Sequence, residues 1–419
     1  MLDDVLPLWL ALACTNDTAT PHAPPAPQPT DTGDIDTEDT GDTGAVDPTW
    51  TLLLFLNGDN DLERWALGDV NEMEAVGSSD RTNVVVQLDR SPEQSDGDGD
   101  WSGARRYLVT ADDDPRTIGS PVLAELGEVD SGSVDAVLDF VEWGVAAYPA
   151  DRVALVLWDH GDGWSLGPQP PDDEWRKGIS DDYSSGSVLS VAAGDLTEVA
   201  AGAAAVLGRP LDLFGFDACT MQQWEVATSV APFAEFMVAS QDYEGTDGWP
   251  YDTVLTELAE DPGVDGAGLG EIISRRFYET GDTTQSVLAL AEVPALSAAL
   301  DDVADAVIAS GLAAELMSAA ALEAQGYDGD YSREHDLVDL LERMAALSDD
   351  AAVDTAVETA ISVTERVIVA NYNQVGRVKN SHGLSIFSPS PAVMPPIYAR
   401  AAWADAYLWD DLIVAAAGP

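Results

Sequence analysis

The sequence is poor in basic residues and has no long apolar run. Its 419 residues include 18 lysines and arginines against 76 acidic residues, a formal net charge of -58, and the only lysines are Lys177 and Lys379. Such a surface repels nucleic acid and attracts basic ligands. A salt-tolerant or high-GC proteome would account for the same acidity. No run of eighteen apolar residues occurs, so we expect no transmembrane helix and, at 46% apolar content, a globular body.

Reactive side chains are also scarce, and two of them occupy matching positions. The chain has two cysteines, Cys14 and Cys219, and four histidines. His160 follows the apolar run 153–158, and Cys219 follows the run 211–216. Short apolar runs of this kind are typical of buried parallel strands. Because the chemistry of open α/β sheets lies beyond the carboxyl ends of the strands, we expect both side chains to face one crevice.

Strand and helix patterns alternate from residue 50 onward. Strands are expected at 51–56, 83–88, 105–110, 153–158, 211–217, 236–240 and 383–387, and helices at 62–76, 133–147, 192–207 and 221–230. The alternation predicts an α/β fold with a mostly parallel sheet sandwiched by helices. We assign residues 50–290 to a catalytic domain and 291–419 to a mostly helical region that completes it.

The first 49 residues differ in composition from the rest. Residues 1–14 resemble a bacterial lipoprotein signal that ends in a lipidated Cys14, although Asp3 and Asp4 stand where positive charge is expected. An ordinary apolar N-terminus is the alternative. Residues 15–49, rich in Pro, Thr, Asp and Gly, predict a disordered acidic linker. We therefore expect an extracytoplasmic protein of the bacterial cell envelope, lipid-anchored or secreted, with no other membrane attachment.

Cys219 and His160 fit nucleophilic catalysis. A cysteine at an exposed strand end can attack a carbonyl, and we expect the N-terminus of the following helix to lower its pKa. His160 would handle protons, and the backbone N–H groups of Gly161 and Cys219 would form an oxyanion hole. Because successive side chains of a strand point to opposite faces, the side chain of Asp159 should point away from that of His160. This favours a catalytic dyad of Cys219 and His160 over a triad that includes Asp159.

Asp217 indicates a substrate preference. Two residues before Cys219 in an extended segment, its side chain should point the same way as the thiol. A carboxylate there disfavours the thiolate unless a cation is beside it. The side chain of a substrate Arg or Lys would be that cation.

The remaining histidines compete weakly with His160. His22 lies in the expected linker, and His335 in an acidic stretch expected to be helical. His382 precedes its strand and is therefore expected at the opposite edge of the sheet. Neither a nucleophile-elbow motif nor paired His or Cys ligands for zinc occur, so no metal site is predicted.

Several fragments together resemble the clostripain family of cysteine peptidases, which have a caspase-like fold. They are Asp159-His160-Gly161, the segment 216–221 with Glu225, the segments 238–242 and 248–251, and, near the start and the end of the region, 57–62 and 382–387. The resemblance implies that His160 is the general acid/base, Cys219 the nucleophile and Asp217 the base of a pocket for Arg or Lys. It places Ser240 and Asp242 in the same pocket.

The same resemblance implies self-activation by cleavage between the histidine and cysteine strands. The segment 163–187 contains Arg176-Lys177, where we predict processing. No cofactor is required, and calcium is possible. We expect a monomer that acts on proteins or peptides with basic residues. The alternatives are a non-catalytic surface-binding lipoprotein with a peptidase-like fold, or an acyl-transferring ligase on the same fold.

Overall fold

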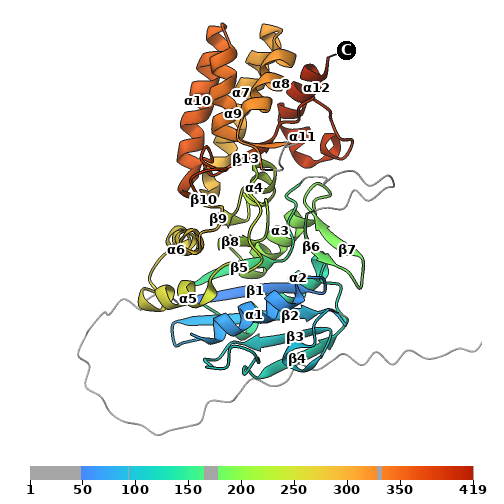
Figure 1. Ribbon diagram of the computed structural model, residues 1–419, viewed down its shortest axis with the longest axis vertical. Helices are drawn as coiled ribbons and strands as arrows, with labels where there is room; N and C mark the ends of the chain where they lie inside the picture. The colour runs from blue at the N-terminus through green and yellow to red at the C-terminus, as the bar shows by residue number, and fades with distance from the viewer. Residues whose placement is uncertain (1–48, 93, 165–177, 328–332, 419) are drawn as a thin grey trace, which may run out of the picture. The chain divides into compact units, whose positions relative to one another are not determined.

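A nine-stranded mixed sheet forms the centre of the fold (Figure 1). The computed structural model describes residues 49–92, 94–164, 178–327 and 333–418. The strand order is β12-β10-β9-β8-β5-β1-β2-β3-β4. The strands are β1 (Trp50–Gly58), β2 (Thr82–Arg90), β3 (Ala104–Leu108), β4 (Val122–Gly127), β5 (Arg152–Trp158), β8 (Leu211–Asp217), β9 (Ala234–Ala239), β10 (Thr284–Ala289) and β12 (Ile368–Asn373).

The five central strands run parallel, and the strands at both edges run antiparallel. β2, β1, β5, β8 and β9 pair in parallel, whereas β3, β4, β10 and β12 pair antiparallel. In the register of β5 with β8, Trp158 is opposite Asp217, the last residue of its strand. His160 and Cys219, each two residues further along, therefore leave the sheet side by side at its carboxyl edge.

Alternating side chains of the sheet divide the core into two layers. Leu52 and Leu54 of β1 belong to a core with helices α1 (Glu63–Glu74), α5 (Tyr251–Glu260) and α6 (Gly266–Thr280). Leu53 and Phe55 belong to the other core, with α2 (Val134–Ala147), α3 (Asp195–Leu207) and α4 (Trp224–Val230). This period of two, with apolar residues on both faces, is what a strand covered on both sides requires, and the predicted sandwich is confirmed.

The region after residue 290 is mainly helical and also contributes to the sheet. Its helices are α7 (Val293–Ser310), α8 (Ala313–Glu323), α9 (Leu337–Leu347), α10 (Ala351–Val367), α11 (Ala402–Ala406) and α12 (Trp409–Ala417). β12 extends the sheet beside β10. The strand predicted at 383–387 is shorter, β13 (Ser385–Phe387), and pairs with β11 (Glu334–Asp336) in a separate two-stranded sheet. The helix expected around His335 is wrong, because this residue lies in β11. Within the described ranges, no helix has the length and apolar character that crossing a membrane requires.

A second two-stranded sheet lies beside the carboxyl edge. It consists of β6 (Gly178–Asp182) and β7 (Ser187–Ser190), which the sequence did not predict. β6 joins the carboxyl edge because Gly161 forms an isolated bridge with Ile179 and Asp162 N–H donates to Gly178 O. The segment after β6 is tied to β1 as well, since Tyr183 N–H donates to Asp59 O at 2.8 Å.

Candidate active site

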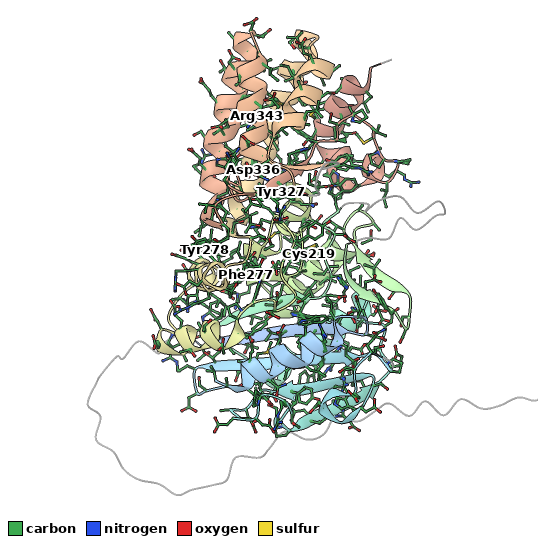
Figure 2. All side chains as sticks on the ribbon, in the orientation of Figure 1. Cys219, Phe277, Tyr278, Tyr327, Asp336 and Arg343 are labelled. Carbon is green, nitrogen blue, oxygen red and sulfur yellow. The ribbon has the colours of Figure 1, made fainter. Side chains whose placement is uncertain are left out.

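A pocket of about 150 Å³ at the carboxyl edge is lined by both predicted reactive side chains. His160 and Cys219 lie on its wall together with Asp217, Glu244 and Gly248. Cys219 lies two residues after the end of β8 (Figure 2). The topology therefore brings together three residues that the sequence singled out, because β5 and β8 are adjacent parallel strands.

The backbones of Gly161 and Cys219 approach each other closely. A Cβ atom on Gly161 would lie 2.4 Å from the carbonyl oxygen of Cys219, so only glycine fits. The next residue, Thr220, adopts a left-handed conformation with φ of 56° and donates its N–H to Asp242 O at 3.1 Å. A non-glycine residue in this region carries backbone strain, which here turns the chain sharply after the cysteine.

The Cys219 thiol is largely buried among acidic groups. Glu244 N–H donates to its sulfur at 3.4 Å. Burial, above all, raises the pKa of the thiol to about 11, and the charges of Asp162, Asp242 and Asp282 add to the effect. The expected lowering by a helix N-terminus is wrong, because α4 begins only at Trp224 and residues 220–223 separate it from the sulfur. The free protein therefore holds a neutral thiol at neutral pH.

His160 is paired with an aspartate that the sequence did not single out. Its Nε2 lies 2.8 Å from Asp61 Oδ1, which also accepts the hydroxyl of Tyr183 at 3.2 Å. The hydrogen bond from His160 lowers the pKa of Asp61. The only signal for Asp61 was its place in the polar run that follows β1.

The hydrogen bonds to the Asp159 carboxylate come from backbone and side-chain amides, and the described ones include none from the imidazole of His160. Its buried carboxylate accepts hydrogen bonds from the side-chain amides of Asn57 and Asn60 at 3.1 and 2.7 Å. It also accepts the backbone N–H groups of His160 at 2.6 Å and Asp181 at 2.5 Å. Asp159 thus joins β1, β5 and β6 below the histidine.

The floor of the pocket is acidic and buried. Asp217 accepts the hydroxyl of Tyr251 at 2.8 Å and the N–H of Trp249 at 3.2 Å, and burial raises its pKa to about 6. Both carboxyl oxygens of Glu244 are buried next to the carboxyl of Asp217, and burial and the charge of Asp217 raise the pKa of Glu244 well above the usual value. Behind the pocket lining, the carboxyl of Asp69 accepts the indole N–H of Trp158 at 2.6 Å. Glu244 and Asp69 come from distant loops and helices, so strand periodicity could not reveal them.

Ser240 and Asp242 lie beside this pocket, but they are not among the described residues that line it. Both are fully buried. The Ser240 hydroxyl is 2.8 Å from that of Thr284, and the Asp242 carboxylate forms an ion pair with Arg377. Their side chains are occupied in linking β9 to β10 and to the segment after β12. Cys14, Arg176 and Lys177 lie outside the described residues.

His382 lies at the carboxyl edge, not at the opposite edge as predicted. The N–H of the next residue, Gly383, donates to the side chain of Gln241, which follows β9. The prediction failed because β13 belongs to the separate sheet. His382 is absent from the pocket lining and instead contacts Asp336, with 2.8 Å between Nδ1 and Oδ1.

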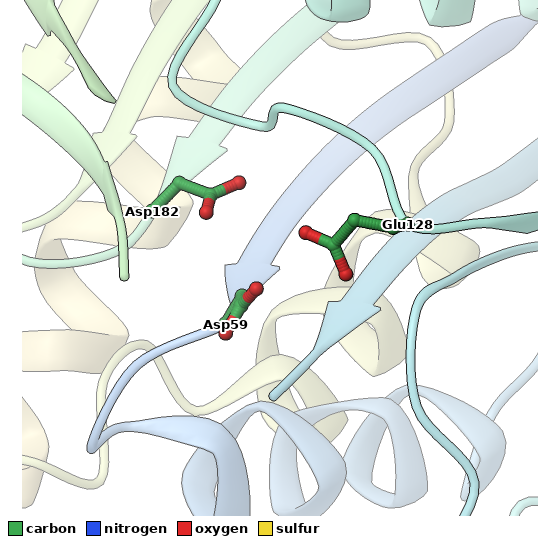
Figure 3. A group of neighbouring side chains, drawn as sticks. All are labelled: Asp59, Glu128 and Asp182. Atoms are coloured by element: carbon green, nitrogen blue, oxygen red, sulfur yellow. The ribbon is translucent and has the colours of Figure 1, made fainter. Parts of the chain in front are cut away.

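The residues with the best geometry for a metal ion are not in the pocket. They are Asp59, Glu128 and Asp182, whose carboxylate oxygens converge beside the end of β1 (Figure 3). The pocket itself combines a thiol, an imidazole and buried carboxyls.

Comparisons with known proteins identify the family of the chain. The model of the clostripain family, peptidase family C11, matches residues 54–413. Clostripain of Hathewaya histolytica is 25% identical over 228 residues, which cover 50% of this chain and 42% of that protein, less than half its length.

Two solved structures have the same fold. A secreted C11 cysteine protease from Bacteroides thetaiotaomicron superposes with a TM-score of 0.61 at 21% identity, covering 88% of this chain and 98% of that one. An inactive zymogen C11 protease from Parabacteroides distasonis superposes with a TM-score of 0.61 at 21% identity, covering 87% of this chain and 100% of that one. Because the family model spans nearly all of the sheet and the C-terminal helices, the chain belongs to the clostripain family.

Proposed function

We propose that the chain is a cysteine endopeptidase that cleaves peptide bonds after Arg or Lys. The observation that carries the proposal is the shared pocket, in which the thiol of Cys219 and the imidazole of His160 stand beside two buried carboxyls, Asp217 and Glu244. Membership of the clostripain family supports the peptidase chemistry.

The reaction uses the thiol as nucleophile. Cys219 Sγ attacks the scissile carbonyl carbon while the thiol proton passes to His160, which then gives it to the leaving amine. Water hydrolyses the resulting thioester and regenerates the thiol. We expect the N–H groups of Gly161 and Cys219 to donate to the oxyanion, and the close approach of the two backbones supports this role. Asp61 acts as a positioning residue, since it holds Nε2 and leaves Nδ1 for proton transfer.

The acidic floor selects a basic side chain. An ammonium or guanidinium group beside Asp217 stabilises the carboxylate, which burial otherwise disfavours. Burial is the main cause of the raised pKa of Cys219, and the same positive charge offsets the acidic groups that add to it. A basic substrate residue therefore favours the thiolate form of Cys219, and it also makes the contact with Asp217 that gives the specificity.

We place the enzyme outside the cytoplasm, anchored through Cys14 or secreted, and propose that it processes itself after Arg176 or Lys177. Both basic residues fit the proposed specificity and lie between the histidine and cysteine strands. The intact mass of wild type and of Cys219→Ala would report lipid on Cys14 and the position of any chain break. A break that persists in Cys219→Ala, or in the protein with both basic residues changed to alanine, would contradict self-processing.

Hydrolysis of matched reporter peptides tests the specificity. Wild type should cleave Lys and Arg reporters at least about 100-fold faster than a Leu reporter, and Cys219→Ala should cleave none. Asp217→Asn should lose the preference. Because the pKa of Asp217 is about 6, kcat/KM for the basic reporters should fall below pH 6. Equal rates for wild type and Cys219→Ala would remove the peptidase proposal, and an aminolysis product with an added amine would indicate a ligase.

A further inference from the structure

Two carboxyl groups of the active-site pocket lie next to each other, and their surroundings differ. Asp217 ends β8, Glu244 lies in the segment after β9, and both line the pocket. The Asp217 carboxylate accepts the hydroxyl of Tyr251 at 2.8 Å and the N–H of Trp249 at 3.2 Å. Both oxygens of the Glu244 carboxyl are buried, and no amide, hydroxyl or basic group among the described residues donates to them. The polar side chain that the Glu244 carboxyl meets is Asp217.

The groups around the Glu244 carboxyl leave it without a positive partner. They are Asp217 and the thiol of Cys219 at the end of β8, Asp282 before β10, the hydroxyl of Tyr251 on α5, His160 across the pocket and, behind Asp217, Asp69 of α1. The described ion pairs include neither Asp217 nor Glu244. Because two adjacent buried carboxylates repel each other, one of the two groups holds a proton. Asp217 keeps the negative charge, since its donors stabilise the carboxylate form, and the proton belongs to Glu244.

We propose that Glu244 is a neutral carboxylic acid in the pocket, donates its proton to Asp217 and sets the charge of the specificity site. The pair then carries one negative charge, which matches the single positive charge of a basic side chain. The carbonyl oxygen of the neutral acid remains as a second acceptor beside the carboxylate. Burial and the charge of Asp217 raise the pKa of Glu244 well above its usual value, in agreement with this state. The role in specificity rests on the proposed peptidase function, whereas the protonation state does not.

The Asp217 carboxylate is accessible because residue 248 is a glycine. A Cβ atom on Gly248 would lie 3.2 Å from both carboxylate oxygens of Asp217 and would fill the space in front of them. Gly248 also has a φ of 58°, in the left-handed region that favours glycine. The pocket of about 150 Å³ therefore reaches the charged member of the pair, and Glu244 lies beside it.

The proton on Glu244 also affects the nucleophile. The backbone N–H of Glu244 donates to Cys219 Sγ at 3.4 Å, so the two residues are in direct contact. An ionised Glu244 would add a second negative charge to the pocket and would disfavour the thiolate. A neutral Glu244 therefore supports both the binding of a single cation and the formation of the thiolate.

The protonation state is tested in the full chain carrying Cys219→Ala, so the outcome is independent of peptidase activity and self-cleavage. At pH 7, the infrared difference spectrum between this protein and its Glu244→Gln variant should show the loss of a protonated carboxylic acid. Because the folded state binds this proton more tightly than the unfolded state, the stability that it contributes is lost as the pH rises. Urea unfolding should therefore show Glu244→Gln gaining stability relative to its parent between about pH 5 and about pH 8. Glu358→Gln, which removes an exposed carboxylate on α10, should show the loss of an ionised carboxylate and no such gain.

The role in specificity is tested in the active protein. Glu244→Gln should keep kcat/KM for the Lys and Arg reporters within about threefold of wild type at pH 7, because the amide resembles the neutral acid. Asp217→Asn, which removes the charge, should lose the preference. The ratio of kcat/KM for Glu244→Gln to that for wild type should rise between about pH 7 and about pH 9, since glutamine cannot ionise.

Two results would overturn the proposal. Loss of an ionised carboxylate in the infrared spectrum of Glu244→Gln would show that Glu244 is charged. A loss of basic preference as large as that of Asp217→Asn would show that Glu244 supplies the selecting charge. A ratio of kcat/KM that stays constant with pH would refute the effect on the thiol. If wild type cleaves none of the reporters, the peptidase proposal fails, and the infrared spectrum still decides the protonation of Glu244.

Discussion

Two histidine–aspartate pairs lie at the carboxyl edge of the sheet, and they differ in what surrounds the aspartate. His160 and His382 are equally exposed, at 42% and 41%, and each has a ring nitrogen 2.8 Å from a carboxylate oxygen. Asp61, the partner of His160, is 60% exposed and contacts Tyr183. Asp336, the partner of His382, is fully buried and also accepts hydrogen bonds from Gln241 and the N–H of Asp339.

This difference separates a reactive pair from a structural one. The Asp336 carboxylate links β11, α9 and the segment after β9, so its contact with His382 is one bond in a buried network. Within the described ranges Asp61 has no such network, and its histidine shares a pocket with a thiol. A His–Asp contact alone therefore does not identify a catalytic site; the neighbouring groups do.

Replacing each histidine by alanine should give the largest difference in activity between the two pairs. His160→Ala should lower kcat/KM for a Lys reporter by about 10³-fold or more, because the acid/base for both proton transfers is lost. His382→Ala should retain activity within about threefold when assayed well below its melting temperature. Similar losses in both variants would remove the distinction between the pairs.

Replacing the buried aspartate should affect stability rather than chemistry. Asp336→Asn should lower the free energy of unfolding by about 3 kcal/mol, since a buried carboxylate with several donors is replaced by an amide that must face some of them with its own N–H groups. Urea unfolding would measure the loss. Asp61→Asn, at an exposed position, should stay within about 0.5 kcal/mol of wild type. A larger loss for Asp61→Asn would give Asp61 a structural role.

Replacing the exposed aspartate should affect turnover. Asp61→Asn should lower kcat about tenfold with KM within twofold, because it disturbs the orientation of His160 but not the acidic floor. Asp61→Glu should recover part of the loss, and Tyr183→Phe, which removes the other contact of Asp61, is the matched control. A rise in KM with unchanged kcat would show that Asp61 contacts substrate instead.

The sequence predicted the parts of this edge that depend on strand ends. His160, Cys219 and Asp217 were predictable because apolar runs locate parallel strands and adjacent parallel strands expose their carboxyl ends together. The confirmed sandwich follows from the same runs. Asp61 and Glu244 were not predictable, since their roles depend on how loops fold over the strand ends.

Two of the errors have related causes. The position of His382 was wrong because a three-residue strand such as β13 carries no signal for which sheet it joins. The pKa of Cys219 was expected to fall, yet burial among carboxyls raises it to about 11. Burial and the charges of distant segments are tertiary properties, and a local pattern of strand followed by helix does not contain them.

The smallest expected effect is a pH-dependent contribution of His382 to stability. Its hydrogen bond to Asp336 raises the pKa of the folded histidine above the ordinary 6.5, so the folded state holds the proton more tightly than the unfolded state. The stabilisation is therefore fully present below pH 6.5 and is lost as the pH rises through the folded pKa. Unfolding free energies of wild type and His382→Gln should differ most at pH 5.5–6 and converge at pH 9.

The difference in unfolding free energy between wild type and His382→Gln also cancels the opposite pH effect of His335 on stability. Burial lowers the pKa of His335 to about 4, so that residue costs stability as the pH falls below 6.5 in both proteins alike. Because His382 is 41% exposed, solvent screens its pair, and the difference should be modest at low salt and smaller still at high salt. A difference that grows with rising pH would contradict a protonated His382 and would assign its contact with Asp336 to the neutral imidazole.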